Sequence, residues 1–360
     1  MKYISEFRDS VKVKELSSLI HKISRKNISI MEVCGSHTMA IHRFGIKELL
    51  PKNIRLISGP GCPVCVTAID YVDKAVELAK MQDIIITTFG DLIKVPGSYS
   101  TLEKEKAKGE DVRIVYSILE SIDLAISNPD KHVVFLAIGF ETTTPPTAAG
   151  IIKAQEMNLK NFSVLCAHKV MPPPMQAIIE EGIKTDGFLA PGHVSVITGI
   201  EMYKFIVDKF HKGVVVSGFE PIDIMQSIFM LVKQMEENKP KVEIQYTRVV
   251  KPEGNQKARA LIEKVFDFTD ASWRGLGMIP LSALKIRTEY EKFDAEKAFN
   301  IKIKQTKEPK GCICGQVLKG LNQPSDCKLF GKVCTPENPT GACMVSSEGA
   351  CNVFYRYGAN

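Results

Sequence analysis

Short apolar segments recur along the first two thirds of the chain, and stretches of helical periodicity lie between them. The segments are rich in β-branched residues, and they begin roughly 25 to 30 residues apart. They cover residues 28–33, 54–58, 84–88 and 112–116, followed by 133–138, 162–166, 187–189 and 214–216. Strands and helices that alternate at this interval are typical of βαβ units, so the pattern predicts an α/β fold with parallel sheets.

The strands fall into two series of four, which predicts two similar α/β domains that flank a cleft. We expect the first domain to span residues 27–130 and the second to span residues 131–242. Residues 1–26 predict an N-terminal helix that packs on another domain. From residue 243 to residue 360 the sequence becomes irregular and rich in glycine, proline and cysteine, which predicts a C-terminal domain that needs a metal centre for stability.

Composition and charge narrow the class of protein. Hydrophobic residues make up 44% of the 360 residues and charged residues 24%, as in soluble globular proteins. The net charge of +6 is scattered, so nucleic acid is not an expected partner. The N-terminus lacks the apolar core of a signal peptide, and no apolar run is long enough to span a membrane. We therefore expect a cytoplasmic protein with no membrane partner, whose thiols stay reduced.

Six of the ten cysteines lie in the last fifty residues: Cys312, Cys314, Cys327, Cys334, Cys343 and Cys351. Their spacing fits neither zinc fingers nor the common ferredoxin motifs. Four thiolates suit a [4Fe–4S] cluster, and the remaining two could form a redox pair beside it. Structural zinc is the alternative that the spacing leaves open.

Three further cysteines follow predicted strands. Cys34 ends the first strand segment, and Cys62 and Cys65 follow a Gly-Pro-Gly turn after the second. Neighbouring parallel strands are about 5 Å apart, so these thiols could meet around one metal ion. His37 could ligate the same ion or form a hydrogen bond to one of its ligands. Cys166 lies inside an apolar segment and is interpreted as a core residue.

Polar side chains also follow the later strands. Glu141 begins a run of threonines after residues 133–138, and His193 follows the segment at 187–189. Ligands bind at the carboxyl ends of parallel strands, so both residues are candidates to line the cleft.

Five motifs resemble those of the HypD family of hydrogenase maturation proteins, over residues 10–357. They read MEVCGSHT from Met31, GPGCPVCVT from Gly59, GFETTTP from Gly139, PGHVS from Pro191, and DCKLFG from Asp326 through GACMVSSEGAC to Cys351. In many family members the first motif is Cys-Gly-x-His-x-His, whereas Met39 stands here at the second histidine.

The resemblance implies two α/β domains and a C-terminal iron–sulfur domain. It also implies a scaffold that, with the small chaperone HypC, assembles the Fe(CN)₂CO group of [NiFe]-hydrogenase and accepts cyanide from HypE. The hydrogenase large subunit would then be an indirect partner. In this interpretation Cys34, Cys62 and Cys65 surround the iron with His37 beside them, and the protein is an assembly scaffold with redox activity rather than a conventional turnover enzyme.

The tail also resembles ferredoxin:thioredoxin reductase, in which a cluster lies next to a redox disulfide. That resemblance favours Cys312, Cys327 and Cys334 as cluster ligands. The fourth ligand and the redox pair then come from Cys314, Cys343 and Cys351 in an order that the sequence leaves open.

Two alternatives to the scaffold remain. One is a thiol–disulfide reductase of the ferredoxin:thioredoxin reductase type, and the other is a zinc-stabilised interaction protein. A third upstream cysteine, Cys34, favours the scaffold because a reductase needs only the pair Cys62 and Cys65.

Overall fold

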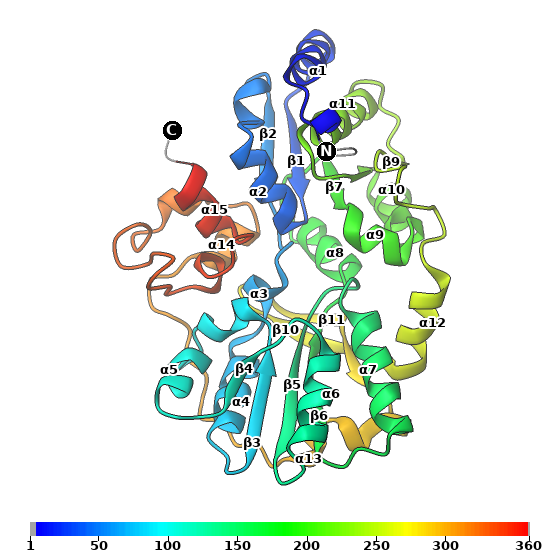
Figure 1. Cartoon of the computed structure of the whole chain (residues 1–360). Helices are drawn as coiled ribbons and strands as arrows, with labels where there is room; N and C mark the ends of the chain where they lie inside the picture. The colour runs from blue at the N-terminus through cyan, green and yellow to red at the C-terminus, as the bar shows by residue number, and fades with distance from the viewer. Residues whose placement is uncertain (1–4, 359–360) are drawn as a thin grey trace.

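Two parallel β-sheets, one above the other, organise the chain (Figure 1), and the computed structural model describes residues 5–358. The upper sheet has five strands in the order β2-β1-β7-β8-β9. Their bounds are β1 (Ile28–Glu32), β2 (Ile54–Ser58), β7 (Gly187–Pro191), β8 (Gly213–Ser217) and β9 (Val242–Ile244). All are parallel, and the three central strands β1, β7 and β8 are almost completely buried, as is typical of a parallel sheet covered on both faces.

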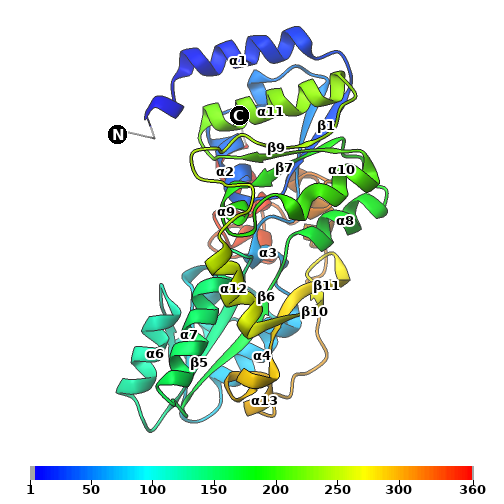
Figure 2. The same ribbon diagram turned by 90° about the vertical axis from the view of Figure 1, so that its right-hand side faces the viewer.

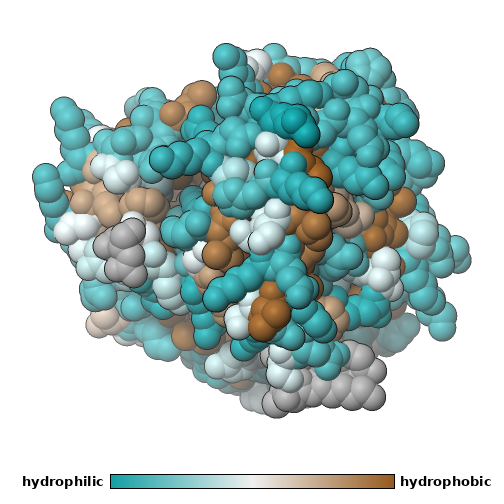
Figure 3. All heavy atoms as spheres, turned by 90° about the horizontal axis from the view of Figure 1, so that it is seen from above, coloured by the Kyte–Doolittle hydropathy of each residue, from teal (hydrophilic) through white to brown (hydrophobic). Residues whose placement is uncertain are grey.

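Helices cover both faces of the upper sheet. They are α2 (Gly35–Arg43), α8 (Pro172–Glu180), α9 (Gly192–Thr198), α10 (Lys204–Phe210) and α11 (Pro221–Glu236). The predicted N-terminal helix is α1 (Ser10–Ile23), which begins at the cap residue Asp9 and lies along α11 (Figure 2). Residues 1–4 of the predicted N-terminal segment lie outside the described part of the chain. Seen from the α1 end, the surface is largely hydrophilic, with hydrophobic side chains in separate groups (Figure 3).

The lower sheet has four parallel strands in the order β4-β3-β5-β6. They are β3 (Ile84–Thr88), β4 (Val112–Ile114), β5 (His132–Gly139) and β6 (Phe162–His168). Its helices are α4 (Ile69–Ala79), α5 (Leu102–Ala107), α6 (Ile118–Ser127) and α7 (Thr144–Glu156). The expected α/β class with parallel sheets is therefore confirmed.

The chain crosses between the sheets more often than the sequence predicts. It leaves the upper sheet after β2, builds the whole lower sheet, and returns to the upper sheet with β7. The predicted boundary near residue 130 therefore does not follow the sheets, because β3 pairs with the later strand β5 and so places β3 and β4 in one sheet with β5 and β6. Hydrophobic periodicity identifies strands but not their partners, and Ile30 of β1 pairs with both Leu56 and the distant Gly187.

Residues 243–298, expected in the C-terminal domain, belong largely to the two sheet layers. β9 extends the upper sheet, and α12 (Gln256–Val265) connects the upper sheet layer to the lower one. An antiparallel hairpin of β10 (Phe266–Trp273) and β11 (Gly277–Ile286) then packs beside β6, followed by the short helix α13 (Ala295–Ala298). The cysteine-rich tail begins only after this helix.

The tail contains little regular structure. Its helices are α14 (Cys314–Leu318) and α15 (Ala350–Tyr357), and α15 packs on α2 of the upper sheet layer. The tail lies at the left of Figure 1, next to the short helix α3 (Pro63–Val66), which lies between the two sheets.

Candidate thiol site between the sheets and the tail

Cys34 lies in the loop between β1 and α2, at the N-cap position of the helix. The loop before Cys62 packs directly on it: a Cβ atom on Gly61 would lie 2.2 Å from the backbone nitrogen of Cys34. The backbone N–H of Gly35 also donates to the carbonyl of Gly61 at 3.1 Å. Only glycine at position 61 permits this approach, so the sequence Gly-Pro-Gly brings the Cys62 loop against the Cys34 loop.

The Cys34 thiol is buried, and burial raises its pKa to about 12. The nearby carboxylate of Glu348 raises the pKa further, whereas the backbone N–H groups of Ser36 and His37 oppose the shift. Cys34 is therefore a protonated thiol at neutral pH, and it would lose its proton on binding a metal ion.

Cys62 and Cys65 flank the first turn of α3. The thiol sulfur of Cys62 accepts a hydrogen bond from the backbone N–H of Cys65 at 3.3 Å, which caps the helix. Cys65 is completely buried, and burial raises the pKa of its thiol well above the ordinary value. The pair is thus held in place by the start of a helix and is shielded from water.

Cys65 also reaches the tail. Its thiol lies close enough to the thiols of Cys62 and Cys343 for both to shift its pKa. The chain allows this because Gly349 has no side chain: a Cβ atom there would lie 3.0 Å from the sulfur of Cys65. Two groups of cysteines almost 280 residues apart in the sequence therefore touch, with Cys65 Sγ 3.9 Å from the carbonyl oxygen of Ala342.

The contacts continue inside the tail. The thiols of Cys314 and Cys351 lie close enough to Cys343 to shift its pKa, and Cys312 Sγ donates to Cys314 Sγ at 3.2 Å. All ten cysteines are free thiols in the structure. A continuous series of sulfur atoms thus runs from the end of β2 into the interior of the tail.

Five tail thiols surround one small enclosed hollow, whose volume is about 10 Å³. They are Cys312, Cys314, Cys327, Cys334 and Cys351. Gly341 closes the hollow, because a Cβ atom there would lie 2.5 Å from Cys314 Sγ and 2.7 Å from Cys312 Sγ. Thiols are ligands of both iron–sulfur clusters and structural zinc, and within residues 5–358 these sulfur atoms would have to move outward to hold either. Cys343 does not line the hollow, and it contacts Cys65 instead.

His37 is fully buried, and its Nε2 donates a hydrogen bond to the carbonyl of Gly218 at 2.9 Å. Nδ1 has no partner within residues 5–358, and burial lowers the pKa of the ring to about 4. The ring is therefore neutral at physiological pH, with its lone pair on Nδ1.

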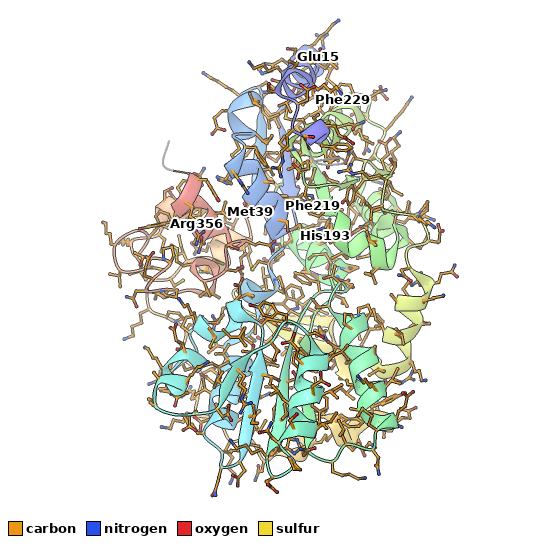
Figure 4. All side chains as sticks on the ribbon, in the orientation of Figure 1. Glu15, Met39, His193, Phe219, Phe229 and Arg356 are labelled. Carbon is orange, nitrogen blue, oxygen red and sulfur yellow. The ribbon has the colours of Figure 1, made fainter. Side chains whose placement is uncertain are left out.

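Phe219 stacks on His37 at 4.7 Å between ring centroids and on His193 at 3.9 Å. His193 and Met39 lie near Phe219 in Figure 4, and all three residues line a cavity of about 770 Å³. Met39, at the position of the second histidine of the family motif, thus faces the same space as His193.

Glu141 lies elsewhere. It is buried at the end of β5, its Oε1 accepts a hydrogen bond from the backbone N–H of Met171 at 2.9 Å, and burial raises its pKa to about 7. It lines a separate, largely apolar cavity of about 610 Å³ beside the β10–β11 hairpin. The structure therefore places the two cleft candidates, Glu141 and His193, in different cavities.

Two residues of the site were missed by the sequence analysis. Glu348 accepts a hydrogen bond from the Ser36 hydroxyl at 2.5 Å and so ties the tail to the Cys34 loop. Arg274, at the turn between β10 and β11, is buried next to the tail thiols. Glu348 lies inside the motif GACMVSSEGAC, and this position indicates a place near the site. The sequence around Arg274 gives no indication of its long-range contacts.

The remaining thiol, Cys166, donates to the carbonyl of Leu284 at 3.3 Å and packs against the core of the lower sheet. Within residues 5–358 no three His, Cys, Asp or Glu side chains already have the arrangement of a metal-bound group, so joint ligation of iron by Cys34, Cys62 and Cys65 stays a prediction. No helix in that range is long and apolar enough to cross a bilayer.

The model of a family designated HypD, described as "Hydrogenase formation hypA family", matches residues 11–358. The chain belongs to the HypD family. Its relatives include hydrogenase maturation factor HypD2 of Bradyrhizobium diazoefficiens. The two sequences are 48% identical over an alignment of 369 positions, which covers 99% of this chain and 97% of the relative.

Two further relatives of the HypD family extend the comparison. Hydrogenase maturation factor HypD of Azotobacter vinelandii is 47% identical over 99% of this chain and 97% of its own length. A putative hydrogenase expression/formation protein of Methanocaldococcus jannaschii is 45% identical over 97% of this chain and 98% of its own. The likeness therefore covers the sheets and the tail alike.

Proposed function

We propose that this protein is a [NiFe]-hydrogenase maturation factor on which the Fe(CN)₂CO group is assembled, together with a HypC-type chaperone and a HypE-type cyanide donor. Membership of the HypD family and the names of its relatives support a role in hydrogenase maturation. The observation that carries the finer proposal is the contact of Cys65 with Cys343, because it joins the upstream thiols to the tail thiols.

The iron is the cargo of this scaffold. Iron that carries cyanide and carbon monoxide is soft and low-spin, and thiolates are good ligands for it. Cys34, Cys62 and Cys65 are the thiols at the ends of β1 and β2 that could hold it, and the unpartnered Nδ1 of His37 could accept a hydrogen bond beside it. Because burial keeps Cys34 and Cys65 protonated, loading the iron would release their protons.

The tail would hold a [4Fe–4S] cluster as resident cofactor, which supplies electrons one at a time. Cys312, Cys327 and Cys334 line the small hollow, as do Cys314 and Cys351. Cys351 is the preferred fourth ligand, because Cys314 is the thiol that interacts most strongly with Cys343 and is therefore assigned to the redox pair. Cys314 and Cys343 then form the redox pair, because Cys343 lies within reach of both Cys314 and Cys65.

The thiols can supply the electrons that cyanide transfer needs. Release of cyanide from a thiocyanate-type donor takes two electrons: the S–CN bond breaks, and the donor leaves as a thiol. Cys62 and Cys65 can provide both electrons by forming a disulfide, and one of their two protons goes to the donor sulfur and the other to cyanide. Cys314 and Cys343 can then restore the dithiol by thiol–disulfide exchange.

Infrared spectroscopy tests the scaffold directly. The protein would be co-purified anaerobically with its HypC-type partner and scanned for the stretching bands of cyanide and carbon monoxide. We expect bands in the wild-type complex and none in Cys34→Ala. Absence of the bands from a wild-type complex that contains iron and a visible-absorbing cluster would overturn the scaffold.

A thiol–disulfide reductase is the second candidate, because the series of thiols from the tail to Cys62 also suits reduction of a protein disulfide. Rapid reduction of a generic disulfide substrate, unaffected by Cys34→Ala, would favour it.

A further inference from the structure

Arg274 is a buried arginine at the turn between β10 and β11. Only 6% of the residue is exposed. Its Nη2 donates a hydrogen bond to the carbonyl of Pro96 at 2.7 Å, whereas Nε and Nη1 are buried without a hydrogen-bond partner within residues 5–358. A guanidinium stays charged in proteins, and burying one with unpaired N–H groups is costly, so a negative partner is needed nearby.

The backbone around Arg274 fixes it between the two groups of thiols. Its N–H donates to the carbonyl of Val66, the residue after Cys65, at 3.0 Å. On the other side, Gly275 packs against Gly315, the residue after Cys314, and a Cβ atom on Gly275 would lie 2.4 Å from Gly315 Cα. The hairpin turn therefore bridges α3 and α14, and any movement of the turn would move both.

The charged and sulfur-bearing groups around the guanidinium are few. Arg274 lines a cavity of about 540 Å³ with Cys312, Cys314, Glu308 and Lys319. Glu308 is exposed, so water screens its charge. Lys319 forms a salt bridge with Glu181 at 2.6 Å. The charge of Glu308 is the largest that acts on Arg274, followed by the sulfurs of Cys314, Cys343 and Cys312. Because Glu308 is exposed, negative charge on the buried tail sulfurs would match the guanidinium most effectively.

We propose that Arg274 is the buried counter-charge of the tail sulfur site and sets its reduction potential. The inference rests on the proposed [4Fe–4S] cluster. A cluster held by four thiolates carries a net negative charge, which increases by one unit when it accepts an electron. A buried cation stabilises the reduced form more than the oxidised form, so Arg274 raises the potential. Arg274 is thus a positioning residue that touches neither cyanide nor iron cargo.

A redox titration of the anaerobically purified full-length protein tests this. The cluster would be titrated with dithionite and mediators and followed by electron paramagnetic resonance. Arg274→Gln removes the charge but keeps hydrogen-bond donors. We expect reduction to become at least tenfold less favourable, which is about 59 mV toward negative potentials for a one-electron couple.

Two variants separate charge from structure. Arg274→Lys keeps the charge, and its potential should stay near that of the wild type. Arg287→Gln removes an arginine at the far end of the same hairpin, where it pairs with Asp267 at 3.4 Å, and should leave the potential unchanged.

The outcomes distinguish this inference from the proposed function. A wild-type protein without cluster absorption would overturn the proposed cofactor itself. A wild-type cluster with equal potentials in Arg274→Gln and Arg287→Gln would overturn the role of Arg274 alone. If Arg274→Gln does not retain the cluster, the potential of Arg274→Lys is measured instead. A bound cluster with the wild-type potential in Arg274→Lys supports the role of Arg274 as counter-charge. Loss of the cluster from Arg274→Lys, or a shifted potential, assigns Arg274 a structural role.

Discussion

The upstream thiols and the tail thiols are held in place by different kinds of structure. Cys34, Cys62 and Cys65 lie in loops that leave β1 and β2, two strands paired in register from Ile28 and Ile54 to Glu32 and Ser58. The tail has no sheet, and turns such as the one from the N–H of Cys334 to the carbonyl of Leu329 at 2.9 Å position its thiols. Sulfur atoms themselves fill part of its interior.

The two geometries have different physical origins. The sheet packs a large aliphatic core and fixes the upstream loops whether or not a metal is present. The tail buries few aliphatic side chains, so its geometry depends on what its cysteines bind. Substitutions in the two regions should therefore separate function from folding.

The largest loss of function is expected from substitution of Cys34, Cys62 or Cys65. Cys34→Ala, Cys62→Ala and Cys65→Ala should each lower hydrogenase maturation by more than about 100-fold, because each removes a group that holds iron or supplies electrons. Circular dichroism and the tail absorption should stay those of the wild type, because the sheet holds the loops. Cys166→Ala is the control and should mature hydrogenase normally. Full maturation by all three variants would disprove the iron site.

The second effect is expected in the tail. Cys327→Ala or Cys334→Ala should bleach the cluster absorption and expose the tail, since few other interactions hold it together. Hydrogen exchange should become fast in residues 312–351 and stay slow in β1 and β7. Unchanged absorption would remove the substituted residue from the ligand set, and loss of protection in both regions would abolish the distinction between them.

A third test concerns the contact between the Cys34 and Cys62 loops. Gly61→Ala places a methyl group 2.2 Å from the backbone of Cys34, and it should destabilise the protein by about 3 kcal/mol. Gly90→Ala is the matched control, because the nearest atom to its added methyl lies 3.9 Å away. Equal midpoints of the two variants in urea unfolding would contradict the tight contact.

The smallest effect is expected on the pH dependence of stability, from the buried carboxyl group of Glu141. Burial raises the pKa of Glu141 to about 7, above its unfolded value of 4.5, so the folded state favours the protonated form. Its contribution to stability is complete below pH 4.5 and is lost as the pH rises toward 7, by up to about 2 kcal/mol from pH 5 to pH 7. Glu141→Gln should flatten this decline in a series of thermal melts, and an unaltered pH profile would contradict it.

Local features of the sequence predicted much of the fold. The segment at 28–33 corresponds to β1, and the helix predicted in the N-terminal segment corresponds to α1. Strand pairing could not be predicted, because the contact of Ile30 with Gly187 depends on packing between segments that the sequence does not relate. For this reason the predicted domain boundary near residue 130 does not coincide with the division between the two sheets.

The candidate site shows the same limit. The turn before Cys62 and the crowding of cysteines in the tail are local signals, and they identified both groups of thiols. The contact of Cys65 with Cys343 and the burial of Arg274 arise only when the hairpin and the tail fold onto α3. Local patterns identify reactive residue types, whereas long-range packing decides which of them meet.

The order in which the strands join the upper sheet has a consequence for synthesis of the protein. β1 and β2 are made first, but β7, which covers the other edge of β1, is made only after the entire lower sheet. At about 5 to 20 residues per second, the ribosome needs many seconds to reach β7 and longer to reach the tail. During that interval the three upstream thiols lack the cover that the tail later provides, so the nascent chain is most vulnerable to oxidation before its last fifty residues have emerged.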